Sequence, residues 1–141
     1  LTHGIRATSY YPDIPQDKPC GNLNSSSLDL CKWMLHNLSI YHRESTGVVS
    51  AATLTDMWTT KRDIPGYTTS IGWGWWIVQS KKYGKYVFHV GNDPGYSATL
   101  MLSPENDFGI VLLCNGEYPR QIVWNQLPFQ IMDLFSEEWK R

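Results

Sequence analysis

The chain has 141 residues, of which 42% are hydrophobic and 18% are charged, and its formal net charge is -1. This composition fits one folded domain or part of one, and it argues against a disordered chain. The near-neutral charge gives no reason to expect nucleic acid or an anionic membrane as a partner. No apolar run approaches the roughly 20 residues that a membrane-spanning helix needs.

The first half of the chain predicts a lead-in loop followed by two helices. Residues 1 to 24 contain prolines and glycines with little periodicity, which predicts a loop. Ser25 to Ser27 offer an N-cap for a helix over residues 28–38, where apolar residues recur at helical spacing. Ser50 is placed to cap a shorter helix over residues 51–58. The turn-rich residues 59–69 predict a surface connection, so residues 25–70 form a helical part.

The second half of the chain predicts an antiparallel sheet. Runs of apolar and β-branched residues separated by turn residues are typical of short strands joined by tight turns. Four such runs occur, at residues 71–79, 86–89, 98–102 and 110–114. They give three to four strands, because the first two runs can form a hairpin. Gly72 and Gly74 lie inside the first run and indicate a bulge or a close backbone approach.

A final helix is predicted from about Arg120, where an apolar helical pattern begins. Pro128 lies inside that pattern and predicts a kink or break. The fold class is therefore α+β: an antiparallel sheet of three to four strands with a C-terminal helix on one face and two helices upstream. Residues 71–141 form the sheet and this last helix, and the whole chain is expected to be a single unit.

The cysteines and most of the histidines give no evidence of a metal site or a cofactor. Cys20, Cys31 and Cys114 fit neither a metal-ligand spacing nor a fully paired disulfide framework. Small buried hydrophobic residues are the simpler interpretation, and the disulfide state is left open. Three further histidines have no partner at ligand spacing and are expected to be solvated: His3, His36 and His42.

Residues 86–115 carry the most informative motif of the chain. The sequence there is YVFHVGNDPGYSATLMLSPENDFGIVLLCN, with His89 near the end of a predicted strand and a turn-forming Asn-Asp-Pro-Gly run behind it. On the residues alone, His89 is more simply a structural or surface histidine. Tyr96 is expected to pack against its neighbours or to line a cleft.

Several motifs together resemble the C-terminal part of the class C β-lactamase and penicillin-binding-protein-like serine hydrolases. The resemblance rests on the order and spacing of five segments: residues 21–30, 72–76, 89–96, 104–109 and 110–115. It implies a β-lactamase/transpeptidase-like fold of which the chain is a single C-terminal segment. It also implies an extracytoplasmic location, either periplasmic or secreted.

The nucleophile of this family is absent from the sequence. The family uses a Ser with a Lys three positions later, and a second motif of the form Tyr-x-Asn or Ser-x-Asn. Neither pattern occurs in these 141 residues. Because both motifs precede this region in the family, the resemblance implies that the nucleophile lies outside the chain and that the chain alone is inactive.

The resemblance implies a substrate-binding role for the stretch that begins at His89. His89-Val90-Gly91 stands where the family has Lys-Thr-Gly on the strand beside the nucleophile. His89 and the backbone N–H of Asn92, an oxyanion-hole donor, are then the catalytic candidates, and Val90, Gly91 and Tyr96 are the substrate-binding candidates. His89, whose charge depends on pH, stands where the family has a lysine with a permanent positive charge, and Val90 stands where the family has a threonine with a hydroxyl. The implied reaction is hydrolysis of a β-lactam, a D-amino-acid peptide or an ester through an acyl-enzyme. The substrate is a small molecule or a peptide, either cell-wall-like or an ester, and no cofactor is implied.

A non-catalytic module of the same fold that binds a peptide or a glycan is the alternative hypothesis. The chain contains seven Trp, eight Tyr and four Phe, although core packing is the simpler role for most of them. In the family, two further strands complete the sheet beside the last strand of this chain. Without them, residues 109–115 present an apolar edge. We therefore expect self-association or pairing with the missing N-terminal part.

Overall fold

The computed structural model describes residues 15–18, 20–21, 23–116 and 120–136. Most of the predicted lead-in loop, including His3, lies outside the described residues. A short turn of 3-10 helix, η1 (Pro15–Asp17), precedes the first long helix. No helix in the described part of the chain is long and apolar enough to cross a membrane.

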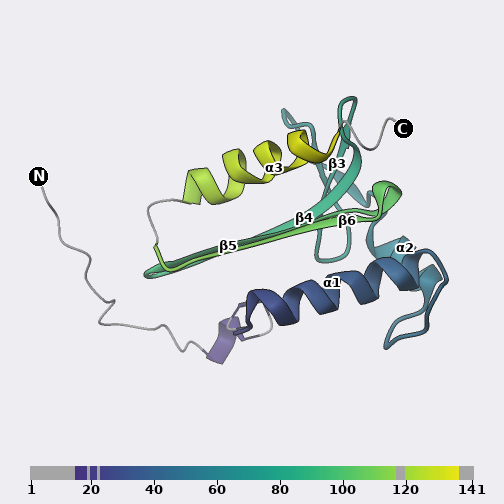
Figure 1. Cartoon of the computed structure of the whole chain (residues 1–141), viewed down its shortest axis with the longest axis horizontal. Helices are drawn as coiled ribbons and strands as arrows, with labels where there is room; N and C mark the ends of the chain where they lie inside the picture. The colour runs from purple at the N-terminus through teal and green to yellow at the C-terminus, as the bar shows by residue number, and fades with distance from the viewer. Residues whose placement is uncertain (1–14, 19, 22, 117–119, 137–141) are drawn as a thin grey trace, which may run out of the picture.

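The described chain forms one antiparallel sheet between helices on its two faces. Figure 1 shows α1 (Ser27–Tyr41) on one face of the sheet and α3 (Leu127–Ser136) on the other. The strands follow one another in chain order and pair with their sequence neighbours. Their bounds are β1 Arg62–Asp63, β2 Thr69–Ile71, β3 Trp76–Ser80, β4 Gly84–Asp93, β5 Tyr96–Ser103 and β6 Phe108–Cys114. The predicted α+β class with a C-terminal helix on one face is confirmed.

The sheet has six strands, so the prediction of three to four was wrong. β1 and the first residue of β2 lie where residues 59–69 predicted only a surface connection. A turn with Gly66 at φ +80° folds the chain back, and Arg62 of β1 then lies opposite Ile71 of β2. The predicted run 71–79 is also interrupted, because the Gly72 N–H donates to the Trp75 carbonyl and Gly74 adopts φ +74°. Local glycine geometry therefore ends β2 at Ile71 and starts β3 at Trp76.

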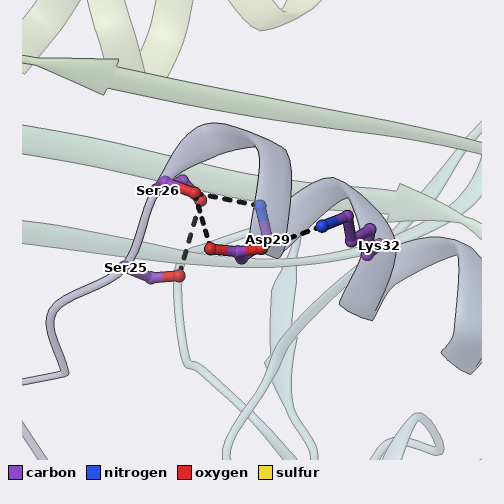
Figure 2. A network of polar contacts seen from close by, with 4 residues as sticks. All are labelled: Ser25, Ser26, Asp29 and Lys32. Atoms are coloured by element: carbon purple, nitrogen blue, oxygen red, sulfur yellow. Dashed lines mark hydrogen bonds and ion pairs between the residues drawn. The ribbon is translucent and has the colours of Figure 1, made fainter.

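Both upstream helices begin at the serines that the sequence indicated. Figure 2 shows the start of α1, where the Ser26 hydroxyl accepts a hydrogen bond from the Asp29 N–H (3.1 Å) and donates to the Asp29 carboxylate (2.8 Å). The Lys32 ammonium lies 3.2 Å from the same carboxylate. Ser50 caps α2 (Ala51–Met57) by accepting from the Thr53 N–H. These caps satisfy N–H groups that have no partner inside the helix.

The two faces of the sheet bury separate cores. On the α1 face, α1 and α2 contribute to a cluster that includes Leu38, Trp58, Val87 and Leu102, each at most 1% exposed. On the α3 face, Met132 of α3 packs in a second cluster with residues of β3 to β6. Successive strand residues alternate between the two clusters, as the period of a β-strand requires.

Where the sequence predicted a kink or break at Pro128, the structure has a change of helical type and no break. A π-helical segment, η3 (Ile122–Gln126), leads directly into α3. Pro128 is the second residue of α3 and has no N–H to donate to the preceding π-helical turn. The helix pattern thus continues through the proline with a change in helical type just before it.

The three cysteines do not share one environment, so the expectation of three small buried residues was wrong for Cys20. Cys20 is exposed, whereas Cys31 and Cys114 are half-buried. Cys31 packs against the core of the α1 face. No disulfide joins any of the three, all of which belong to the described residues.

Candidate active site

The candidate site lies on the second half of β4, which differs from the first half in its strand partners. β3 pairs with β4 only from Gly84 to Phe88, where Trp76 is the last partner. β5 pairs with β4 as far as the Asp93–Tyr96 pair. Residues 89–93 therefore have β5 on one edge and, within the described part of the chain, no strand on the other. Residues 89–93 of β4 and the β5 residues that pair with them, 96–100, are called the arm. Figure 1 shows β4 and β5 extending away from β3 here.

The predicted site residues alternate between the two faces of this arm. His89 and Gly91 lie on the face of Val87, which belongs to the α1-side core, and Val90 and Asn92 lie on the α3 side. His89, Gly91 and Asn92 are exposed, and Val90 is half-buried. The structure thus brings all four to the same unpaired edge of one strand.

Tyr96 lies farther along the arm than the other site residues. It is opposite Asp93 at the β4–β5 hairpin, and its side chain is 48% exposed. The strand partner of His89 is Leu100, four residues after Tyr96. At about 3.4 Å per residue, the Cα atoms of His89 and Tyr96 are separated by roughly 13 Å along the strands. Tyr96 is therefore on the face of His89 but at the tip of the arm.

The tip of the arm is a tight hairpin built by Pro94 and Gly95. Gly95 has φ +84°, a conformation that favours glycine. β4 therefore continues as a strand through Asn92 and Asp93, residues that the sequence placed in a loop. The N–H of Asn92 belongs to the regular strand rather than to a flexible turn.

Gly91 is not required by the fold. A Cβ atom added at Gly91 would meet only the Cβ of Ala98, at an ordinary contact distance of 3.8 Å, and Gly91 does not have a positive φ. Gly72 is different, because a Cβ there would lie 2.3 Å from the Met57 carbonyl oxygen. The absence of a side chain at Gly91 thus leaves open space on the strand at the place where its edge is unpaired.

Two hydroxyl groups of β5 fix the arm from the α3 side, and sequence reasoning did not identify them. The Ser97 hydroxyl donates to the Gly116 carbonyl (2.8 Å), and the Thr99 hydroxyl donates to the Val123 carbonyl (2.8 Å). Both side chains are at most 3% exposed. The sequence did contain a signal for them, because Ser97 and Thr99 alternate with apolar residues in the apolar run of β5. These bonds hold the arm in place without occupying its unpaired edge.

Chemically, the arrangement can bind an extended ligand along a strand edge and place an imidazole beside it. Backbone N–H and C=O groups on an unpaired edge hydrogen-bond an added strand or peptide. The described residues hold no group of three or more His, Cys, Asp or Glu placed to bind a metal ion.

The comparison with known families shows which family this chain belongs to. The profile of the family Beta-lactamase matches residues 2–130. The chain belongs to the β-lactamase family. A solved structure described as the octameric penicillin-binding protein homologue from Pyrococcus abyssi matches with 27% sequence identity and a TM-score of 0.60. No curated protein sequence gives a significant match.

The β-lactamase-family assignment confirms the resemblance seen in the motifs, and the solved relative supports the same fold. The match covers 76% of this chain but only 24% of the Pyrococcus abyssi chain. This chain therefore spans about a quarter of the length of that relative. The roles of individual residues in the arm are not decided by these similarities.

Proposed function

We propose that the chain forms the substrate-binding wall of a β-lactamase-related serine hydrolase whose nucleophile lies outside these 141 residues. The observation that carries the proposal is the unpaired, exposed edge of residues 89–93, which includes a glycine that the fold does not need. The family assignment supports acyl transfer by a serine as the reaction class. The sequence contains no Ser followed three residues later by Lys, which supports a nucleophile outside this chain.

In this mechanism the substrate lies as an extended chain against the free edge of β4, over Gly91. The serine oxygen attacks the substrate carbonyl carbon, and the negative charge that develops on the carbonyl oxygen is stabilised by the N–H of Asn92. The leaving group departs with a proton, and an acyl-enzyme remains. Water then adds to the acyl carbon, and the serine is released as the acid product forms.

His89 and Val90 set the preference for the substrate in this proposal. A histidine carries a positive charge only when it is protonated, and valine has no hydroxyl to donate to a substrate carboxylate. An acyl substrate without a required carboxylate, such as an ester, therefore fits better than a β-lactam. Tyr96, at the tip of the arm, contacts the distal end of a longer substrate.

The test uses a fluorophosphonate probe and a fluorescent penicillin, followed by mass spectrometry. The isolated chain and the longer polypeptide of which it forms the C-terminal part are compared. We expect only the longer polypeptide to be labelled, on a Ser with Lys three residues later. Labelling of the isolated chain, or of neither protein while both are folded, would overturn the proposal.

Variants of the longer polypeptide test the role of the strand edge. Gly91→Val places a side chain against the substrate and should lower the acylation rate by about tenfold or more, because small misplacements cost large factors in rate. Gln79→Val provides the control, since Gln79 is exposed on β3, which does not extend along residues 89–93. If both variants lowered the acylation rate equally, Gly91 would no longer support the proposal.

A non-catalytic binding module is the second candidate, and exposed aromatic rings favour it. The Trp73 side chain is 58% exposed, and Trp33 is 44% exposed while stacked on Trp75 with 6.0 Å between ring centroids. Such rings bind the apolar faces of sugars and peptides. This candidate predicts that cell-wall fragments quench tryptophan fluorescence of the isolated chain, that Trp73→Ala removes the effect, and that His89→Ala does not.

We propose self-association separately from the catalytic role. The solved relative from Pyrococcus abyssi is described as octameric, which supports an assembly of several copies for this chain. The catalytic proposal does not require the assembly, so the two can be tested separately.

A further inference from the structure

One carboxylate on the arm has no partner within the described residues. The structure describes six aspartates between residues 23 and 136, and five of them lie beside a polar or charged group. The five pairs are Asp29 with Lys32, Asp56 with Lys61, Asp63 with Ser70, Asp107 with His42, and Asp133 with Lys82. Asp93 is the sixth, and its half-buried side chain makes no hydrogen bond or ion pair with any described residue. A charge that is partly removed from water without a partner costs free energy, so the Asp93 carboxylate is available to a cation.

The hairpin at the tip of the arm does not use this carboxylate. An aspartate ahead of a turn can stabilise it by accepting a hydrogen bond from the backbone two residues on. Here Pro94 and Gly95 form the two-residue connection, and the Asp93 side chain accepts no hydrogen bond from residues 94–96, all of which the structure describes. Asp93 therefore resembles Gly91, because the fold gives no reason for its side chain.

An exposed aromatic ring stands beside the Asp93 carboxylate. Tyr96 is the strand partner of Asp93 and lies on the same face of the arm, with 48% of its side chain exposed. The Cβ atoms of such a cross-strand pair are about 4.5–5.5 Å apart. A carboxylate binds an ammonium group by a charge-assisted hydrogen bond, and the negative face of an aromatic ring attracts the same cation. The pair is suited to a protonated amine and would repel an anion.

This pair adjoins the backbone group that the catalytic proposal assigns to the substrate carbonyl. The closing pair of a two-residue hairpin exchanges both of its N–H···O bonds, and hydrogen-bonded pairs then alternate with non-hydrogen-bonded pairs along the strands. Asp93 and Tyr96 close this hairpin, so Asn92 and Ser97 form a pair of the second kind. The N–H of Asn92 therefore points to the unpaired edge, and the next Cα atom along the strand, about 3.8 Å away, is that of Asp93.

We propose that Asp93, with the Tyr96 ring beside it, binds a protonated amino group on the acyl part of the substrate. The preferred substrates are then esters or peptides of an amino acid whose free amine lies next to the carbonyl that is attacked. This inference rests on the proposed function and narrows its substrate. The ammonium group binds and does not react: the serine oxygen still bonds to the carbonyl carbon, and the leaving group still departs with a proton.

The other end of the unpaired edge is left for the leaving group. His89 lies four residues before Asp93 on the same face, which separates their Cα atoms by roughly 13 Å. An amine next to the carbonyl at Asn92 reaches Asp93 but not His89. Gly91 leaves the space between them open. His89 and Tyr96 are the other titratable residues on this face of the arm, so Asp93 carries its only permanent charge at neutral pH.

The test compares two esters that differ only in the charge of the amine. The longer polypeptide, which carries the nucleophile in this proposal, is assayed with the p-nitrophenyl ester of alanine and with the p-nitrophenyl ester of N-acetylalanine of the same chirality. At about pH 6 the free α-amino group is protonated, whereas the acetylated one has no charge. We expect kcat/KM to be about tenfold or more higher for the free amine, because hydrogen bonds to charged groups are the strong ones. This preference should fall as pH rises and the amine loses its proton.

Two variants assign the preference to Asp93. Asp93→Asn should lower kcat/KM for the alanine ester by about tenfold and leave that for the N-acetylalanine ester unchanged, since only the first substrate has a charge to lose. Asp93→Glu keeps a carboxylate and should retain part of the preference. Asp63→Asn is the matched control, because Asp63 is exposed on β1 at the edge of the sheet, and it should behave as the original protein does. Circular dichroism shows whether each variant is folded.

The outcomes separate this inference from the proposed function. Hydrolysis of both esters without a preference for the free amine would overturn this inference alone, and that measurement needs no variant. A preference that Asp93→Asn leaves intact, or an equal loss for both esters in that variant, would also overturn it, because Asp93 would then not contact the amine. Hydrolysis of neither ester, with no serine labelled by the fluorophosphonate probe, would overturn the proposed function and this inference together.

Discussion

The two halves of β4 perform different tasks on one continuous strand. From Gly84 to Phe88 the strand has partners on both edges, and Tyr86 and Val87 are buried in the two cores. From His89 to Asp93 it keeps only β5, and three of its five residues are exposed. The first half therefore contributes to folding and holds the second half in place. The second half is free to contact a ligand because folding requires little from it.

The largest difference between the halves should appear in stability. Leu102 lies opposite Val87 in the buried half and is completely buried. Leu102→Ala should lower the free energy of unfolding by about 2–5 kcal/mol, because it leaves a cavity in the core. His89→Ala, in the exposed half, should change it by less than about 0.5 kcal/mol. Urea denaturation at one fixed protein concentration measures both. Similar losses in the two variants would contradict the division of the strand.

Two glycines give the second contrast. Gly72→Ala should lower the free energy of unfolding by about 1–3 kcal/mol, since its Cβ would lie 2.3 Å from the Met57 carbonyl oxygen and the loop must move. Gly91→Ala should be neutral within about 0.5 kcal/mol, because its Cβ meets only Ala98 at 3.8 Å. Thermal unfolding of the two variants decides the point. A large loss for Gly91→Ala would mean that the fold, and not a ligand, requires this glycine.

The sequence predicted the features of this fold that depend on local patterns. The serine caps of α1 and α2, the helical spacing of α1 and the apolar runs of β5 and β6 are each readable within a few residues. The strands β1 and β2 were missed, because so short a segment, two residues in β1 and three in β2, becomes a strand only when a turn brings a partner beside it. β3 begins at Trp76, opposite Phe88, and so leaves the edge of β4 open from His89 onward. This starting point depends on how the two strands align, which composition alone does not reveal.

The candidate site could be predicted only in part for the same reason. The motif that starts at His89 marked a segment of β4 as the candidate site, but the open edge of this segment depends on where β3 begins. The bonds that Ser97 and Thr99 make to Gly116 and Val123 connect residues 19 and 24 positions apart. No short pattern contains both partners of such a bond. The individual roles of His89, Val90, Gly91, Asn92 and Tyr96 stay predictions.

The support of the arm from the α3 side is the third feature to test. Thr99→Val removes a buried hydroxyl that donates to the Val123 carbonyl at 2.8 Å. We expect a loss of about 1–2 kcal/mol in the free energy of unfolding, because the carbonyl is left without this donor and the shape of the side chain is kept. Thr99→Ser retains the hydroxyl and should restore part of the hydrogen-bond contribution. Denaturation curves of the two variants separate the hydrogen bond from the lost methyl group.

The smallest effect should appear only at alkaline pH and only in the buried half of β4. Burial raises the pKa of Tyr86 from 10.0 to about 12, because the charged phenolate would lose its hydration. The unfolded chain then releases the proton of this tyrosine first, so its contribution to stability is complete below pH 10 and is lost as pH rises toward 12.

Neighbouring groups titrate in the same pH range, so the Tyr86 contribution has to be isolated by comparison. Burial lowers the pKa of Lys85, which makes the folded state gain stability as pH rises and opposes the tyrosine. Tyr86→Phe keeps the ring and leaves Lys85 in place. The free energy of unfolding of the original chain should therefore fall more steeply between pH 10 and 12 than that of Tyr86→Phe. Parallel pH profiles would mean that Tyr86 is accessible to water, and that the core on the α3 face is more open than its packing indicates.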